Sequence, residues 1–270
     1  MVAADGVRLD VSACAAEFDA AFFRDDGLHR LAEWLAERAA TAPRVDAAVR
    51  WGPPLAPPSK IVCVGLNYRD HAAETNMPIP SEPVLFLKAP SSLAGPHDPV
   101  VIPRGGAKLD WEVELAVIIG KTARYVPEER ATECVAGYAL HNDYSERSFQ
   151  LERGGQWTKG KSADSFAPLG PFLATRDEVP DPGRLDMWLT VNGEHRQRSN
   201  TATMIFGVPA LVSYISQFMT LLPGDVISTG TPAGVGLGMR PPRYLEAGDV
   251  VALGIEGLGT ASQRVVADGG

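Results

Sequence analysis

Two glutamates one residue apart lie inside a segment that otherwise has the pattern of a buried β-strand, residues 109–120. Side chains alternate faces along a strand, so Glu112 and Glu114 must project from one face together with Ala116 and Ile118. Two carboxylates held side by side away from water repel each other, and a bound cation or a proton relieves that repulsion. The segment therefore predicts either an edge strand with solvated glutamates or a buried strand that binds a metal.

Composition limits the class of protein to which the chain can belong. Its 270 residues, 45% of them hydrophobic, can bury one large core or one core with a small appendage. A formal charge of -8 argues against a nucleic-acid partner, because such partners favour a basic surface. The three cysteines are far apart and fit a reducing compartment, and no stretch is apolar enough to span a bilayer. We expect a soluble, cytoplasmic protein without a membrane partner.

The first 58 residues differ from the rest. Helical patterns over residues 17–26 and 27–40 are followed by a proline-rich connector, residues 51–58. We therefore predict a small N-terminal region, residues 1–58, and a larger catalytic domain, residues 59–270.

The larger part is rich in strands. Short apolar runs bounded by turn residues recur, and Asn192-Gly193 between two such runs predicts a hairpin. Helical patterns are few, at residues 127–135 and 209–219. Strands without regular helical crossovers predict a mixed α+β, β-rich fold, with mixed sheets arranged as a sandwich or roll.

A third carboxylate, Asp143, ends the apolar run at residues 137–140. Together with the two glutamates it would form an all-oxygen site, which suits Mg²⁺, Mn²⁺ or Ca²⁺ better than zinc or copper. The alternative role of Asp143 is a helix N-cap for the segment that begins at Tyr144.

Three further groups could take part in chemistry. If residues 68–75 form a helical turn, His71 and Glu74 share a face and can act as a general-base dyad, although surface His-Glu pairs are commoner. A lysine of the segment 157–162 can stabilise an oxyanion, or the segment is an exposed basic loop. The Gly- and Thr-rich turn at residues 228–236 can bind a carboxylate, or it is an ordinary corner.

In this order, these elements resemble the fumarylacetoacetate hydrolase superfamily, over residues 59 to about 266. The motifs that carry the resemblance are Gly-x-Asn-Tyr-x-x-His-x-x-Glu at 65–74, Glu-Pro-Val-Leu-Phe-Leu-Lys at 82–88, Glu-x-Glu at 112–114, Asp-x-x-x-Arg-x-x-Gln at 143–150, Lys-Ser at 161–162 and Thr-Gly-Thr-Pro-x-Gly-Val-Gly at 229–236. The chain is most similar to small bacterial members such as acylpyruvate hydrolases, 2,4-diketo-3-deoxy sugar-acid hydrolases and 2-hydroxyhepta-2,4-diene-1,7-dioate isomerases.

The resemblance implies a role for each motif. It implies a mixed β-sandwich roll, usually homodimeric, that binds Mg²⁺ or Mn²⁺, whose place Ca²⁺ can take in crystals. The implied metal ligands are Glu112, Glu114 and Asp143, the implied catalytic residues are His71, Glu74 and Lys161, and the implied substrate-binding residues are Arg147, Gln150, Gly230 and Thr231. Lys159 is expected at the surface.

These expectations lead to a hypothesis for the reaction. We expect hydrolysis of a carbon–carbon bond in a 2,4-diketo acid of the acylpyruvate type, giving pyruvate and a carboxylic acid. The alternatives are decarboxylation, keto-enol isomerisation or dehydration of a related keto acid at the same site, and a member that binds a metal–diketone complex without catalysis.

Substrate specificity is expected in the loops at residues 74–82 and 236–245. Met239, Arg240 and Tyr244 could meet the variable end of the substrate. Arg240 or Arg243 could bind a second carboxylate there, and the alternative for both is a solvated loop cation.

Overall fold

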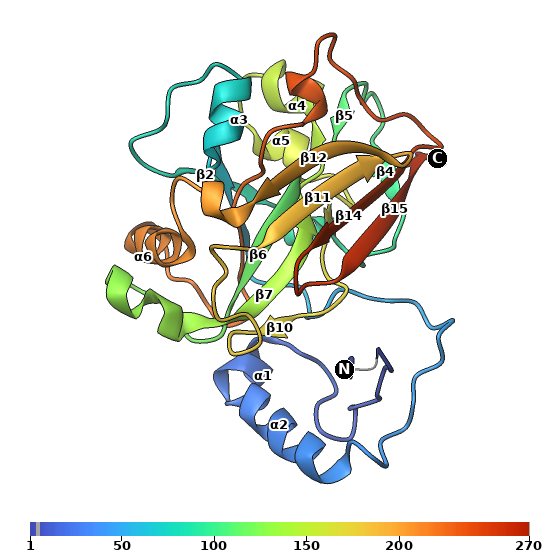
Figure 1. The fold of residues 1–270 in the computed structure, drawn as a ribbon, viewed down its shortest axis with the longest axis vertical. Coiled ribbons are helices and arrows are strands. Elements are labelled where there is room, and N and C mark those ends of the chain that lie inside the picture. The colour runs from blue at the N-terminus through green and yellow to red at the C-terminus, as the bar shows by residue number, and fades with distance from the viewer. Residues whose placement is uncertain (4–5, 270) are drawn as a thin grey trace.

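The computed structural model describes residues 1–3 and 6–269 and is built around a six-stranded mixed sheet (Figure 1). In spatial order its strands are β10 (Ala174–Thr175), β7 (Val135–Asn142), β6 (Val113–Ile119), β13 (Val226–Ser228), β1 (Ile61–Gly65) and β2 (Val84–Lys88). Strand β6 pairs antiparallel with β7 on one side and with β13 on the other, whereas β1 and β13 run parallel. The strand that carries the glutamate pair is therefore interior, and the edge-strand alternative is wrong.

A five-stranded sheet packs beside the first. Its order is β12 (Glu194–Asn200), β11 (Asp186–Val191), β14 (Val250–Ile255), β15 (Thr260–Ala267) and β4 (Val100–Ile102). The tight turn between β11 and β12 has φ of 53° at Asn192 and 80° at Gly193. Left-handed backbone at two successive residues favours Asn-Gly, which confirms the predicted hairpin.

The main core lies between the two sheets. Alternate residues of β6 point into it, as the period of a strand requires. They pack in one apolar cluster with buried residues of β11 and β14, among them Val113, Leu115, Val117, Ile119, Met187, Leu189, Val251 and Leu253. The mixed α+β, strand-rich class predicted from the sequence is confirmed.

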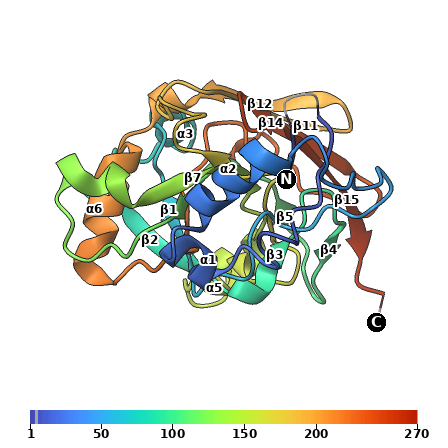
Figure 2. The ribbon, with the colours of Figure 1, turned by 90° about the horizontal axis from the view of Figure 1, so that it is seen from below.

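The N-terminal helices cover part of the opposite face of the six-stranded sheet. Helix α1 (Ala20–Arg24) and helix α2 (Gly27–Arg38) lie below β7 and β10 in Figure 1 and in front of the sheet in Figure 2. Phe22 and Phe23 of α1 share an apolar cluster with Ala116 and Ile118 of β6. Burying each ring contributes on the order of 2–3 kcal/mol. The division into residues 1–58 and 59–270 stays a prediction.

Short elements surround the end of β6 that carries the glutamates. They are α3 (Arg69–Glu74), α4 (Arg147–Leu151), α5 (Thr158–Lys161), the pair β5 (Leu109–Asp110) and β8 (Ser145–Glu146), and the pair β3 (Leu93–Ala94) and β9 (Ala167–Pro168). Single 3₁₀ turns lie at Pro90–Ser92, Thr201–Thr203 and Gly236–Gly238.

Two helices were predicted in the larger part from apolar periodicity. The first is α6 (Val208–Phe218), which agrees with the predicted range. The second, predicted at residues 127–135, is a 3₁₀ helix, Glu128–Cys134, which ends where the chain becomes extended at Val135 to begin β7. Within residues 1–3 and 6–269, no helix is long and apolar enough to cross a membrane.

Candidate metal centre

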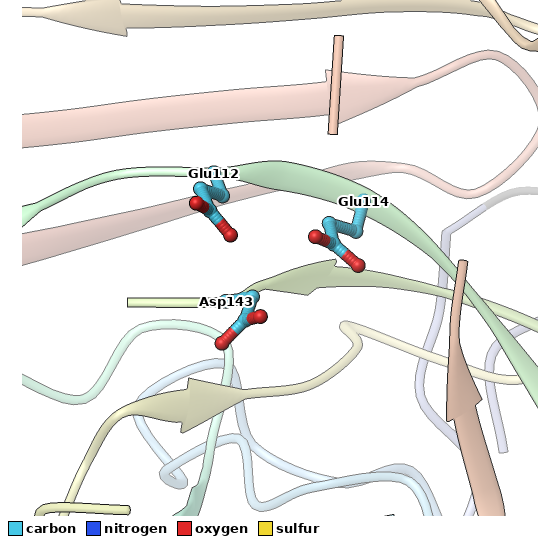
Figure 3. Close-up of side chains that lie close together, drawn as sticks. All are labelled: Glu112, Glu114 and Asp143. Carbon is cyan, nitrogen blue, oxygen red and sulfur yellow. The ribbon is translucent and has the colours of Figure 1, made fainter. Parts of the chain in front are cut away.

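Three buried carboxylates meet where β6 begins and β7 ends. Glu112 directly precedes β6, Glu114 lies within it, and Asp143 directly follows β7 (Figure 3). The ladder pairs Glu114 with His141, and the Asp143 amide donates to the Glu112 carbonyl at 2.9 Å. One oxygen of each carboxylate lies within 4.8 Å of the others, and the three residues are only 6%, 2% and 0% exposed. Strand pairing therefore gathers the predicted metal ligands.

Asp143 is not a helix N-cap. The cap of the next helix, α4, is Glu146, whose carboxylate accepts from the Ser148 amide at 3.1 Å. Both carboxylate oxygens of Asp143 instead accept from lysines, Lys88 on one and Lys161 on the other. The N-cap alternative is wrong because the chain stays extended through β8 before α4 begins.

Lys161 lies between two of the carboxylates. Its ammonium donates to Glu112 Oε2 and to Asp143 Oδ2, each at 2.7 Å. Burial by itself lowers the pKa of Lys161, but Asp143 and Glu112 outweigh that effect and hold its pKa above the usual value. Lys161 is therefore a buried cation of the site and not part of an exposed loop, whereas Lys159 is exposed, as expected.

The acidic cluster still has an excess of negative charge around Glu114. Burial, and then the charges of Asp143 and Glu112, raise the pKa of Glu114 well above its usual value. A bound divalent cation would favour the ionised carboxylate and so offset that shift in the pKa of Glu114. Carboxylate oxygens are the donors that hard cations prefer, so the residues present fit Mg²⁺ or Mn²⁺.

Arg147 connects the acidic cluster to a neighbouring loop. Its guanidinium donates to Glu112 Oε1 at 2.6 Å and to Asp110 Oδ2 at 2.9 Å, and also to the Gln150 side chain at 3.0 Å. Asp110 in turn accepts from the amides of Gly236 and Leu237, at 2.7 and 3.0 Å. The loop that begins at Gly236 is thus fixed relative to a predicted metal ligand.

His71 and Glu74 form the expected pair on α3. His71 Nδ1 lies 3.2 Å from Glu74 Oε2, and the other oxygen of Glu74 accepts from the Gly234 amide at 2.9 Å. The two side chains are only 12% and 20% exposed. Glu74 is therefore held from two sides, which distinguishes the pair from an ordinary surface contact.

The Gly- and Thr-rich turn contacts the site from the end of β13. The Ser228 hydroxyl and the Gly230 amide both donate to Glu114 Oε2, at 2.5 and 2.8 Å. The Thr231 hydroxyl donates to the Val113 carbonyl at 2.9 Å and accepts from Gln197 at 2.8 Å. Gly230 thus holds Glu114, and the Thr231 side chain is already engaged, so the carboxylate-binding role of this turn stays a prediction.

A cavity of about 550 Å³ joins most of the predicted residues. Its walls include eight of them: His71, Glu74, Glu112, Glu114, Arg147, Gln150, Lys161 and Thr231. Asp143 and Gly230 are buried behind this surface. The acidic cluster and the histidine pair therefore line one cavity.

Four buried polar residues of the site received no individual role from the sequence, although Lys88 and Ser228 lie within segments noted there. They are Lys88, Asp110, His141 and Ser228. Lys88 and Asp110 are each a charged residue at the end of a short strand, and that position in the sequence could have pointed to them as site residues. Burial lowers the pKa of His141 to about 3, because the charged imidazole would lose its hydration.

Similarity to known proteins identifies the family of this strand-rich chain, and that family is typically metal-dependent. The model of the fumarylacetoacetate (FAA) hydrolase C-terminal family matches residues 60–266. A relative from Burkholderia multivorans is 53% identical over 261 residues, covering 96% of this chain and 92% of the relative. The chain belongs to the fumarylacetoacetate hydrolase family.

Solved structures agree with this assignment. Fumarylacetoacetate hydrolase from Exiguobacterium antarcticum aligns with a TM-score of 0.85 and 40% identity over 98% of this chain and 94% of that one. Maleylpyruvate hydrolase from Sphingobium sp. SYK-6 aligns at 0.82 and 34%, over 99% and 95%. A 2-hydroxyhepta-2,4-diene-1,7-dioate isomerase from Mycobacterium marinum aligns at 0.72 and 39%, over 85% and 84%. This chain is an enzyme of a family that includes hydrolases and isomerases.

Proposed function

We propose that this enzyme hydrolyses a carbon–carbon bond in a 2,4-diketo acid of the acylpyruvate type, with Mg²⁺ or Mn²⁺ held by Glu112, Glu114 and Asp143. One observation carries the proposal. The His71–Glu74 pair, which can activate water, lines the same cavity as the acidic cluster. Water activation is needed for hydrolysis and not for decarboxylation or isomerisation. The maleylpyruvate hydrolase neighbour supports the same class of reaction.

The chain's own residues would perform the proton transfers. When bound, the divalent cation supplies an electrophile for the 2-keto acid end of the substrate and an electron sink. The carboxylate of Glu74 keeps a proton on His71 Nδ1, which leaves Nε2 as the base. Nε2 removes a proton from water, and the hydroxide adds to the distal carbonyl carbon.

Collapse of that adduct breaks the carbon–carbon bond. The electron pair of the bond passes to the pyruvate fragment as an enolate, and the proton held on His71 returns to its carbon. Lys161 uses two of its three N–H groups on Glu112 and Asp143. The third can donate to the oxyanion that forms at the distal carbonyl. The products are pyruvate and a carboxylic acid.

The outer cavity would hold the variable end of the substrate. Met77, Leu151 and Met239 make part of its wall apolar, and Arg240 adds one cation. Arg243 instead lies 3.7 Å from Asp249, and it is absent from the cavity wall as far as the structure describes it. These positions favour Arg240, of the two arginines considered, as the partner of a second carboxylate.

Keto-enol isomerisation is the second candidate, favoured by the isomerase neighbour from Mycobacterium marinum. We further propose a homodimer, which sedimentation of the purified protein would test. We also propose a cytoplasmic location, which the free thiols of Cys14, Cys63 and Cys134 favour.

The test supplies Mg²⁺ or Mn²⁺ with a panel of acylpyruvates and follows the loss of the diketone absorbance, with products identified by NMR. We expect pyruvate and a carboxylic acid, and a rate about 10²–10⁴-fold lower for His71→Ala. His195→Ala, at an exposed position, is the matched control. Equal rates for the wild type and His71→Ala would refute the role of the dyad. Activity that survives thorough chelation would refute the role of the metal.

A further inference from the structure

His141 is a buried histidine for which the proposed reaction has no use. It lies in β7, paired with Glu114 of β6, and it is only 1% exposed. Its Nδ1 lies 2.7 Å from the Ser228 hydroxyl. Its Nε2 is buried and finds no hydrogen-bond partner among residues 1–3 and 6–269. Buried polar atoms are normally hydrogen-bonded, so a buried imidazole that uses only one of its two nitrogens beside a predicted metal ligand needs a physical reason.

The hydrogen bonds from His141 to Ser228 and from Ser228 to Glu114 show where the protons lie. With a divalent cation bound, Glu114 is ionised and only accepts hydrogen bonds, so the single hydroxyl proton of Ser228 must point at Glu114 Oε2, 2.5 Å away. The hydroxyl oxygen is then left as an acceptor for His141. Nδ1 of the neutral imidazole must therefore carry the proton, and Nε2 must be bare. A bare nitrogen also explains why Nε2 has no acceptor opposite it.

We propose that His141 is a positioning residue that acts through Ser228 on Glu114. His141 fixes the direction of the Ser228 hydroxyl, and this hydroxyl, with the Gly230 amide, holds Oε2 of Glu114. Both of these hydrogen bonds fall on Oε2, which leaves Oε1 of Glu114 available to a cation. The inference rests on the proposed cation site. Groups that orient a metal ligand in this way typically change metal affinity by about 10–100-fold when they are removed.

Substitutions at His141 separate positioning from simple filling of space. Asparagine places an amide N–H close to the position of Nδ1, so His141→Asn should bind Mn²⁺ within about threefold of the wild type. Leucine fills similar space without a donor, so His141→Leu should bind Mn²⁺ about 10–100-fold more weakly in calorimetric titrations. If the two variants bind equally well, the donor has no role and the proposal is wrong.

The role of Ser228 is tested by a double-mutant cycle. If His141 acts through Ser228, then His141→Leu should weaken Mn²⁺ binding little further once Ser228→Ala is present. Fully additive losses would overturn the proposal. The cycle also separates the two hypotheses, because a wild type that binds no Mn²⁺ refutes the cation site itself. A wild type that binds Mn²⁺, together with a folded His141→Leu of the same affinity, refutes only the role of His141.

Nitrogen-15 NMR of the Mg²⁺-loaded wild type needs no substitution and so does not depend on a variant that folds. We expect His141 to show the Nδ1–H tautomer, with a protonated Nδ1 and a bare Nε2. The opposite tautomer, with the proton on Nε2, would overturn the assignment because Ser228 could not then donate to Glu114 and to His141 together.

Discussion

Replacing Lys88 by methionine should destabilise the metal-free protein and, at the same time, strengthen its binding of a divalent cation. The side chains of Lys88 and Asp143 are fully buried, and the ammonium donates to Asp143 and, at 3.1 Å, to the Tyr144 carbonyl. Methionine keeps most of the volume of lysine, so the substitution removes a charge and its hydrogen bonds with little change in packing.

The expected loss of stability follows from burial. Removing one partner of a buried ion pair costs about 3–5 kcal/mol, because an uncompensated charge remains. Asp143 keeps Lys161 on its other oxygen at 2.7 Å, so we expect the lower end of that range, about 3 kcal/mol. In a chain of this length 1 kcal/mol shifts the Tm by about 2–3 °C, so the Tm should fall by about 6–9 °C.

The expected change in metal affinity has the opposite sign. In the wild type a divalent cation bound to Asp143 would be repelled by the ammonium of Lys88, which shares that carboxylate. This repulsion is worth several kcal/mol at an effective dielectric constant of about 20. Because about 1.4 kcal/mol corresponds to a factor of ten in affinity, relief of even part of this repulsion should raise the affinity for Mg²⁺ by about tenfold or more.

Thermal unfolding of the chelator-treated protein and calorimetric titration with Mg²⁺ measure the two effects. Lys159→Met, which removes an exposed lysine nearby, is the matched control and should change stability by less than about 0.5 kcal/mol. A Lys88→Met protein with the Tm of this control would refute the assignment of Lys88 as a buried counter-charge. A loss of both stability and Mg²⁺ affinity would indicate general damage to the site.

Three further predictions concern the pH, the dyad and the substrate. Because the pKa of Glu114 is raised in the metal-free protein, this carboxyl stabilises the fold below about pH 4.5 and loses that contribution as the pH rises. Metal binding must displace its proton, so the gain in Tm on adding Mg²⁺ should be larger at about pH 8 than at about pH 6, and an equal gain would contradict this. A Cβ at Gly238 would lie 2.6 Å from Glu74 Cδ, so Gly238→Ala should displace the Glu74 carboxylate from His71. We expect kcat to fall by about 10²-fold while Mg²⁺ affinity is kept. An unchanged kcat would show that the position of Glu74 is unimportant. Arg240→Met should lower kcat/KM about 10–100-fold for an acylpyruvate with a terminal carboxylate but not for its methyl analogue. Arg243→Met should leave kcat/KM unchanged for both substrates. Equal effects of Arg240→Met on the two substrates would exclude a carboxylate contact.

Periodic local features of the fold could be predicted from the sequence. The turn at Asn192-Gly193 has the left-handed backbone that this dipeptide favours, and the two faces of β6 divide their residues between two apolar clusters as alternation requires. The 3₁₀ helix Glu128–Cys134 could not be predicted, because apolar spacing does not distinguish it from an α-helix that the following strand cuts short.

The candidate site was only partly visible in the sequence. The carboxylates within strand patterns predicted the acidic residues, and the spacing of His71 and Glu74 predicted the dyad. The family motifs pointed to Lys161. Lys88 and Asp110 could not be assigned, since their partners Asp143 and Arg147 lie 55 and 37 residues away in the chain. Only the pairing of strands brings such charges together.

The sequence by itself determined that Glu112 and Glu114 share one face, because side chains along a strand alternate between its two faces. Whether that face was solvated or buried depended on the neighbours of β6, which the tertiary structure supplied as β7 and β13. Burial then decided the chemistry, since buried carboxylates need counter-charges and protein cations alone leave Glu114 with a raised pKa. The family assignment follows from the sequence, whereas the place of each charge around the site follows only from the packed structure.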